Sequence, residues 1–274
     1  MSEVAASVAG AVIGGGQGTR MDTTDPKPML SLGDASFGGR AAWTLSRAIG
    51  GGPVFYSTAP GVEAPLDLPE GVQTVVDPAE DSGPLTGLLE GLLRARGETD
   101  LLLVIPCDMP LLHPTLLRRL IERSEQGGIS FIPTEDGSTS PFPSVWSTRL
   151  ADDLLNLHLR GERSPRAAMS ELGAVAVARD VLSSDAEMML VDPELVSLLD
   201  VNDQSALEVA EANRPRVRTR VGDRRGTARE WNLGGLATAL GVADAAGMNW
   251  VINGRPIAWN AATPLFERDA VSLN

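Results

Sequence analysis

Two short segments carry the side chains that could perform chemistry. The first, "GGGQGTRMDTTDPKPML" from Gly14 to Leu30, follows an apolar run and contains Arg20 and Lys27, the only lysine among 274 residues. A glycine turn lets backbone N–H groups approach an anion, and two cations seven residues apart can converge above it. The segment therefore predicts a phosphate-binding loop, in which lysine serves as a compact point charge where a planar guanidinium would not fit.

The second segment, "PCDMP", places Asp108 directly after the apolar run "DLLLVI". A carboxylate at the end of a buried strand could hold a hydrated Mg²⁺ against substrate phosphates. A helix-capping role is the structural alternative, although Asp108 lies early for the helix expected to start at Pro114. Cys107 beside it is expected to be a small buried hydrophobic residue rather than a nucleophile.

An alternation of strands and helices is expected to position these two segments. The clearest helical pattern is "GPLTGLLEGLLRAR", with leucines at i, i+3, i+4, i+7 and i+8 and with Pro84 suited to the first turn. Such alternation predicts an α/β fold with a mostly parallel sheet, helices on both faces, and ligands at the carboxyl ends of the strands. The expected strands are 7–13, 53–57, 72–76, 100–105 and 129–132.

Composition limits the classes of function. The formal net charge of −13 argues against general nucleic-acid binding. No apolar run approaches the roughly 20 residues of a membrane-spanning helix, and the first residues lack the layout of a signal peptide, so we expect a cytoplasmic protein without a membrane partner. With one cysteine, multi-cysteine metal sites are excluded.

Charge is distributed unevenly along the chain. Residues 1–213 carry a balance of −17, whereas residues 214–274 carry +4, which predicts a domain boundary near Pro215. Beyond it, arginines at 214, 216, 218 and 220 alternate as they would on one face of a strand. That face could be an ordinary solvated surface or a surface for an anion or a partner.

The motifs of residues 7–212 resemble those of a known family. "IGGGQGTRM" followed by "PKPML" is similar to the signature loop of nucleotidyltransferases that resemble sugar-nucleotide pyrophosphorylases. The order and spacing of the later segments resemble the molybdenum cofactor guanylyltransferase family. The sequence departs from that family at Gly14, where alanine is usual, and at "VNDQS", where Asn-Thr-Pro is usual. The matching segments are "DSGPLTGLLEGL", "PCDMPLL", "PFPSVW", "RGERSPRAAM" and "LLDVNDQSALEVA".

The resemblance implies a role for individual residues. Arg20 and Lys27 would stabilise the reacting phosphates, and Asp108 would bind Mg²⁺ and the nucleotide. Arg163, Arg166 and Asn202 would face the acceptor substrate, with capping or surface roles as the alternatives. The other residues implied to contact the nucleotide are Ile13, Gly14, Gly15, Gly16, Ser57 and Asp77.

The implied reaction is transfer of GMP from GTP to the phosphate of molybdopterin, with release of pyrophosphate. It requires no general base, because a phosphate monoester with a second pKa of about 6 is largely dianionic at neutral pH. The residues leave other readings open: a cytidylyltransferase, a sugar-phosphate nucleotidyltransferase, or a non-catalytic cofactor-binding protein.

Residues 214–274 resemble a second family. The expected order of hairpin, helix and short strands is that of a β-grasp fold, and "VING" followed by "TPL" resembles the pattern of sulfur-carrier proteins. The sequence has "VSLN" where sulfur carriers have a terminal Gly-Gly. We therefore expect an α+β docking domain, whose partners would be proteins of molybdenum cofactor biosynthesis or molybdoenzyme maturation.

Overall fold

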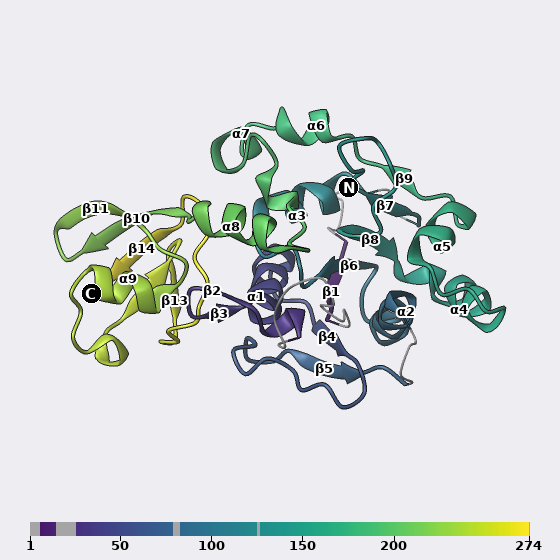
Figure 1. Cartoon of the computed structure of the whole chain (residues 1–274), viewed down its shortest axis with the longest axis horizontal. Coiled ribbons are helices and arrows are strands. Elements are labelled where there is room, and N and C mark those ends of the chain that lie inside the picture. Colours follow the sequence, from purple (N-terminus) through teal and green to yellow (C-terminus); the bar gives the residue numbers. More distant parts are fainter. Residues whose placement is uncertain (1–5, 15–25, 79–82, 125–126, 274) are drawn as a thin grey trace, which may run out of the picture.

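A seven-stranded sheet forms the centre of the larger part of the molecule (Figure 1). The computed structural model describes residues 6–14, 26–78, 83–124 and 127–273. The strand order is β5-β4-β1-β6-β8-β7-β9, and within the described residues only β8 runs against the others. The strands are β1 (Val8–Ile13), β4 (Val54–Thr58), β5 (Gln73–Val76), β6 (Leu101–Pro106), β7 (Ile129–Phe131), β8 (Ser144–Ser147) and β9 (Val175–Ala176).

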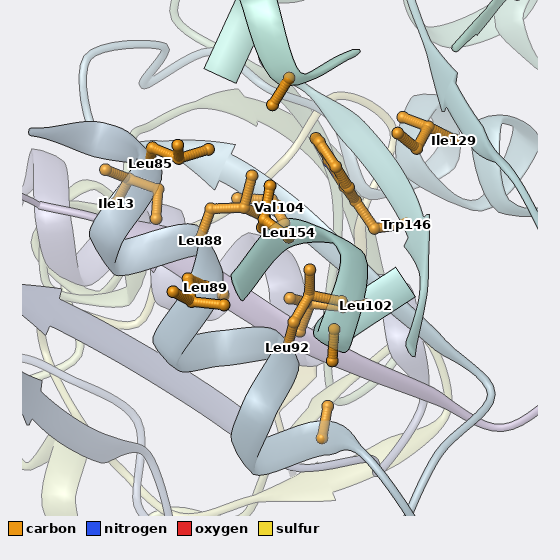
Figure 2. Packing of buried hydrophobic residues seen from close by; sticks show 14 of the residues in the cluster. Ile13, Leu85, Leu88, Leu89, Leu92, Leu102, Val104, Ile129, Trp146 and Leu154 are labelled. Atoms are coloured by element: carbon orange, nitrogen blue, oxygen red, sulfur yellow. The ribbon is translucent and has the colours of Figure 1, made fainter. Parts of the chain in front are cut away.

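Helices cover both faces of this sheet, as the sequence predicts. Strand β6 is buried on both sides, with Leu102 and Val104 in one core and Leu103 and Ile105 in the other. The first face carries α2 (Pro84–Ala95), α4 (Ala151–Leu159) and α5 (Pro165–Glu171), while α1 (Phe37–Ile49), α3 (Pro114–Glu122), α6 (Arg179–Ser183) and α7 (Met188–Val191) supply the second. Figure 2 shows the leucines of α2 packed against the strands.

Short elements connect these layers and lead to the C-terminal part. Four are 3₁₀ turns: η1 (Lys27–Met29), η2 (Thr148–Leu150), η3 (Val196–Leu198) and η4 (Ala245–Gly247). The strands β2 (Ser31–Leu32) and β3 (Ala35–Ser36) form a small hairpin, and α8 (Gln204–Ala212) ends four residues before the next strand. None of the described helices combines the length and apolar character that crossing a lipid bilayer requires.

The C-terminal residues form a second sheet with its own core. Its strands are β10 (Arg216–Val221), β11 (Arg224–Arg229), β12 (Trp250–Ile252), β13 (Arg255–Ile257) and β14 (Ala270–Leu273), in the order β11-β10-β14-β12-β13. Helix α9 (Leu233–Ala239) packs Leu233 and Leu236 against Val217 and Trp250 on one face of this sheet. Figure 1 places this C-terminal unit on the side of α1, away from α4 and α5.

A buried arginine joins the two sheets. Arg40 of α1 is 2 % exposed, and its guanidinium donates to the carbonyl oxygens of Pro110 (2.6 Å), Trp231 (3.2 Å) and Leu265 (3.1 Å). It also lies 5.0 Å from the ring centroids of Trp231 and Phe266. Burial, followed by the charge of Arg47, lowers the pKa of Arg40 to about 9, so the group stays charged at neutral pH.

Apolar packing extends this contact. Trp231 joins Leu32, Phe37 and Val201 in one buried cluster, which therefore contains residues of the β2–β3 hairpin, α1 and the loop before α8. Gly33, at the turn of that hairpin, has φ 63°, and a Cβ there would lie 2.9 Å from Cβ of Trp231. Its conformation and the close approach both favour glycine. The C-terminal unit is thus packed against the larger one by a shared core.

We expect the Arg40→Met substitution to destabilise the whole protein. It removes the guanidinium donor of three carbonyl groups; that of Trp231 keeps the N–H of Leu265, while those of Pro110 and Leu265 lose their side-chain donor, and each unsatisfied buried group costs about 1–3 kcal/mol. The expected loss is about 3 kcal/mol or more in the free energy of unfolding, measured by urea denaturation. The control is Arg94→Met on α2, whose guanidinium lies 4.0 Å from Glu90 at the surface. Equal losses in the two variants would show that Arg40 does not join the units.

Candidate active site

Three polar side chains from distant positions meet beyond the carboxyl end of β6. The ammonium of Lys27 lies 3.1 Å from Oδ2 of Asp108 and also donates a hydrogen bond to Oδ1 of Asn202. Lys27 is only 8 % exposed. A buried charge requires such partners, so the single lysine of the chain is held by a carboxylate and an amide oxygen.

Local backbone structure fixes each member of this group. Pro26 and Pro28 flank Lys27 in the 3₁₀ turn η1, where proline suits the first positions. Asp108 follows β6 by two residues, and its carbonyl accepts from the backbone N–H of Val201 at 2.8 Å. This bond fastens the loop before α8 to the loop after β6, and Asn202 is carried beside Lys27 as a result.

Asp200 is a further member that the sequence analysis missed. Burial, followed by the negative charge of Asp108, raises the pKa of Asp200, while a hydrogen bond with Asn202 and the charge of Lys27 oppose that shift. The signal was present in the sequence, because Asp200 stands two residues before Asn202 in "LLDVND". We call Lys27, Asp108, Asp200 and Asn202 the lysine cluster.

A second buried pair lies at the ends of β4 and β5. The hydroxyl of Ser57 donates to Oδ1 of Asp77 at 2.6 Å, and the two residues are 4 % and 8 % exposed. Burial raises the pKa of Asp77, an effect that the hydrogen bond from Ser57 opposes. Ile13 is the register partner of Ser57 in the sheet, and Gly14 donates its N–H to the carbonyl of Ser57 at 3.0 Å. The sequence-predicted residues Ile13, Gly14, Ser57 and Asp77 are therefore neighbours.

Glycine at two positions leaves room for this pair. A Cβ at Gly87 of α2 would lie 2.6 Å from Oγ of Ser57 and 3.2 Å from Cδ1 of Ile13. A Cβ at Gly14 would lie 2.6 Å from the carbonyl oxygen of Ser57. Helix α2 can approach the strand ends because Gly87 has no side chain there.

A pocket of about 270 Å³ lies next to both groups, although neither Ser57 nor Asp77 lines it. Ile13 lines it on the side of the Ser57–Asp77 pair, and Asp108 and Asp200 line it on the side of the lysine cluster. Pro84, at the start of α2, and the segment from Ser140 to Phe142 complete the wall. The sequence analysis named no site residue in that last segment, although it contributes to the motif "PFPSVW".

Other predicted site residues lie apart from the lysine cluster. Arg163 donates to the carbonyls of His158 and Glu162 at 2.8 Å, and Arg166 is exposed on α5. Within the described ranges, neither guanidinium bonds to the lysine cluster. The carbonyl of Arg163 nevertheless lies 3.6 Å from where a Cβ of Gly83 would be, next to Pro84 of the pocket wall. Gly15, Gly16 and Arg20 lie outside the described residues.

The oxygen atoms of the lysine cluster are of the kind that Mg²⁺ prefers. Asp108 is 24 % exposed at its side chain and lines the pocket together with Asp200. Within the described part of the chain, no group of three or more His, Cys, Asp or Glu side chains could hold a metal ion. The donor set therefore fits an ion that keeps several waters and takes its remaining ligands from substrate phosphates. Cys107 is 3 % exposed and its thiol pKa is raised by burial, as expected for a packing residue.

Comparison with known proteins identifies the family of the chain. The model of the MobA-like NTP transferase domain matches residues 10–176. A molybdenum cofactor guanylyltransferase from Burkholderia ambifaria is 33 % identical over 168 residues, 59 % of this chain and 80 % of that protein. A probable molybdenum cofactor guanylyltransferase from Methanosarcina mazei is 28 % identical over 132 residues, 48 % of this chain and 56 % of its own length.

A solved structure shares the fold. Molybdopterin-guanine dinucleotide biosynthesis protein A from Archaeoglobus fulgidus superposes with a TM-score of 0.56 at 21 % identity, covering 74 % of this chain and 97 % of that one. The family match spans β1 to β9, and so includes Asp108 and both members of the Ser57–Asp77 pair. The chain belongs to the family of MobA-like NTP transferase domains.

Proposed function

We propose that this protein is a molybdenum cofactor guanylyltransferase, which transfers GMP from GTP to the phosphate of molybdopterin in the cytoplasm. The observation that carries the proposal is the buried ammonium of Lys27, held by Asp108 and Asn202 beside a pocket bounded by Ile13. Relatives with that activity in their names, among them the Burkholderia protein, support the choice of substrates.

The reaction needs alignment and charge neutralisation from the protein. A phosphate oxygen of molybdopterin forms a bond to the α-phosphorus of GTP, and the bond from that phosphorus to the bridging oxygen of pyrophosphate breaks. Lys27 uses two of its three N–H donors on Asp108 and Asn202, so the third can turn to a phosphate oxygen. Negative charge that grows on the leaving pyrophosphate is stabilised by this preorganised cation.

The carboxylates would hold the divalent ion. Asp108 and Asp200 are the proposed ligands of Mg²⁺, with Asn202 as a neutral oxygen donor beside them. The ion, when bound, would neutralise phosphate charge and orient the triphosphate. Arg20 in the glycine loop is proposed to add a second cation, and Gly15 and Gly16 to supply backbone N–H groups.

The Ser57–Asp77 pair is proposed to contact the base. A buried carboxylate is a strong acceptor for the N–H groups of guanine, and Ser57 fixes the orientation of Asp77 through the 2.6 Å hydrogen bond. Arg163 and Arg166 are proposed to face the acceptor from the segment next to Gly83.

The C-terminal unit is proposed to be a β-grasp domain that docks proteins of molybdenum cofactor biosynthesis or molybdoenzyme maturation. Support comes from its strand order: with β10 as the first strand, the sheet reads second, first, fifth, third, fourth, and β10 is parallel to β14. Helix α9 follows the first hairpin and packs on one face. The domain boundary near Pro215 stays a prediction.

The substrate choice is tested with the purified protein, Mg²⁺, molybdopterin and each nucleoside triphosphate in turn. We expect pyrophosphate release with GTP and a product whose mass equals molybdopterin plus GMP. A product formed from CTP, or from a sugar phosphate instead of molybdopterin, would assign the alternative transferase. No product with any pair, with cofactor still bound, would indicate a non-catalytic binding protein.

Replacing Lys27 should slow the transfer without unfolding the protein. Loss of one preorganised charge-stabilising group lowers turnover by on the order of 100-fold, so we expect that effect in kcat for Lys27→Ala. Lys27→Arg should not restore the rate, because a planar fork replaces a point charge between Pro26 and Pro28. Wild-type turnover in either variant would remove Lys27 from the mechanism.

A methyl group at Gly87 should disturb nucleotide binding. In Gly87→Ala the new Cβ meets the hydroxyl of Ser57, which must turn away from Asp77. We expect KM for GTP to rise several-fold with a smaller change in kcat. Gly91→Ala is the control, since its Cβ meets only carbons of Leu102 and Ala11. If both variants leave KM unchanged, the Ser57–Asp77 pair does not contact the nucleotide.

A further inference from the structure

One face of the C-terminal sheet carries five exposed arginines. Strands β10 and β11 pair antiparallel, and the register sets Arg216 opposite Arg229 and Arg220 opposite Arg225. Arg218 lies between them on β10. Side chains directly opposite in such a pair point to the same face of the sheet. We call Arg216, Arg218, Arg220, Arg225 and Arg229 the arginine face.

The arginine face points away from the core of its own domain. The alternate residues Val217 and Thr219 are buried, and Val217 packs with Leu233 and Leu236 of α9 on the opposite side. Beside Arg218 and Arg220, strand β14 presents the small residues Ala270 and Ser272. The positive charge therefore lies on β10 and the edge strand β11, beside the small side chains of β14.

Within the described part of the chain these guanidinium groups make no ion pair, although the carboxylate of Glu267 accepts from the backbone N–H of Arg216 at 2.6 Å. Arg220 and Arg229 donate only to the carbonyls of Gly222 and Arg214, and none of the five forms an ion pair there. Like charges directly opposite on neighbouring strands destabilise a sheet. A surface that only kept the protein soluble would carry both acidic and basic side chains, and it would avoid this destabilisation of the sheet.

A cleft borders the arginine face. About 450 Å³ of space lies between Arg216, Arg218 and Thr227 on one side and Leu190 and Val191 of α7 on the other. Arg268, Thr115 and the carboxylates of Glu187 and Glu267 also line it, so the acidic groups of a ligand would lie over the arginines rather than in the cleft. Leu190 is 53 % exposed, and its neighbour Met189 is 59 % exposed. Arg216 and Arg218 of the arginine face therefore lie beside an exposed apolar side chain of α7, that of Leu190.

We propose that the arginine face docks an acidic segment of a partner protein, whose carboxylates meet the arginines and whose apolar side chain enters the cleft beside Leu190. Guanidinium forks match carboxylates in bidentate geometry. The exposed side chain of Leu190 beside Arg216 and Arg218 favours a protein segment that carries an apolar residue over the sugar-phosphate backbone of a nucleic acid. The inference concerns a surface remote from the lysine cluster and does not depend on the proposed reaction.

The test uses the full chain and a labelled ten-residue peptide of alternating glutamate and leucine. Binding of the peptide is followed by fluorescence anisotropy, and a labelled single-stranded DNA of ten nucleotides is measured in the same way for comparison. Association between copies of the chain is measured separately by sedimentation. The face variant is Arg218→Glu with Arg220→Glu. The matched control, Arg224→Glu with Arg255→Glu, changes the net charge equally at exposed residues outside the arginine face.

We expect the face variant to weaken peptide binding at least tenfold and the control to leave it nearly unchanged. The face variant should also unfold at a temperature no lower than the control, because Arg220→Glu sets a carboxylate opposite Arg225 in place of a like charge. The proposal is overturned if both variants lose binding equally, or if the peptide does not bind the wild type. It is also overturned if DNA binds as tightly as the peptide, or if sedimentation shows that the face mediates association between copies of this chain.

Discussion

The burial of one ammonium group organises the site. The ammonium group of Lys27 is largely buried, and Asp108 and Asn202, 81 and 175 residues further along the chain, supply the oxygens that it contacts. Their loops are in turn joined by the backbone bond from Val201 to Asp108. Removal of any one of these side chains leaves the others facing an uncompensated charge or an unsatisfied polar group. The contacts that compensate the buried charge of Lys27 also place a cation and carboxylates beside a pocket, as the proposed binding of a triphosphate and its metal ion requires.

Residues of the C-terminal unit contact the loops that carry the lysine cluster. Arg40 reaches the carbonyl of Pro110, two residues after Asp108, while it holds Trp231 and Leu265 of the other unit. Trp231 shares a core with Val201, which adjoins both Asp200 and Asn202. The two loops of the lysine cluster are therefore in contact with residues that the C-terminal unit keeps in place. A unit joined in this way acts as part of the scaffold of the site. Its arginine face stays exposed, as the proposed docking of an acidic segment requires.

Sequence alone predicted the sheet and the helix of leucines, and it named seven residues that the structure brings together in two buried groups: Ile13, Gly14, Lys27, Ser57, Asp77, Asp108 and Asn202. Strands 7–13, 53–57 and 100–105 were foreseeable because buried parallel strands are continuous apolar runs. Lys27 was foreseeable as the only lysine, placed after a glycine-rich segment, and Asp108 as a carboxylate directly after an apolar run. Asp200 was missed because its position two residues before Asn202 does not by itself show that it lies near Asp108, a proximity that the fold creates. Arg40 was missed for a related reason. An arginine in a helical pattern is expected at the surface, whereas Arg40 is buried against Trp231 and Leu265 of the C-terminal unit. The placement of Gly15, Gly16 and Arg20 stays a prediction.

The most direct test of the central claim is a double-mutant cycle between Lys27→Met and Asp108→Asn, measured as kcat/KM for transfer from GTP to molybdopterin. If the two side chains act as one charge-compensated unit, each single variant loses most of the activity and the double variant loses little more than the worse single one. Losses that multiply in the double variant would contradict this account, because they would mean that Lys27 and Asp108 act independently and that their contact in the folded protein has no part in catalysis.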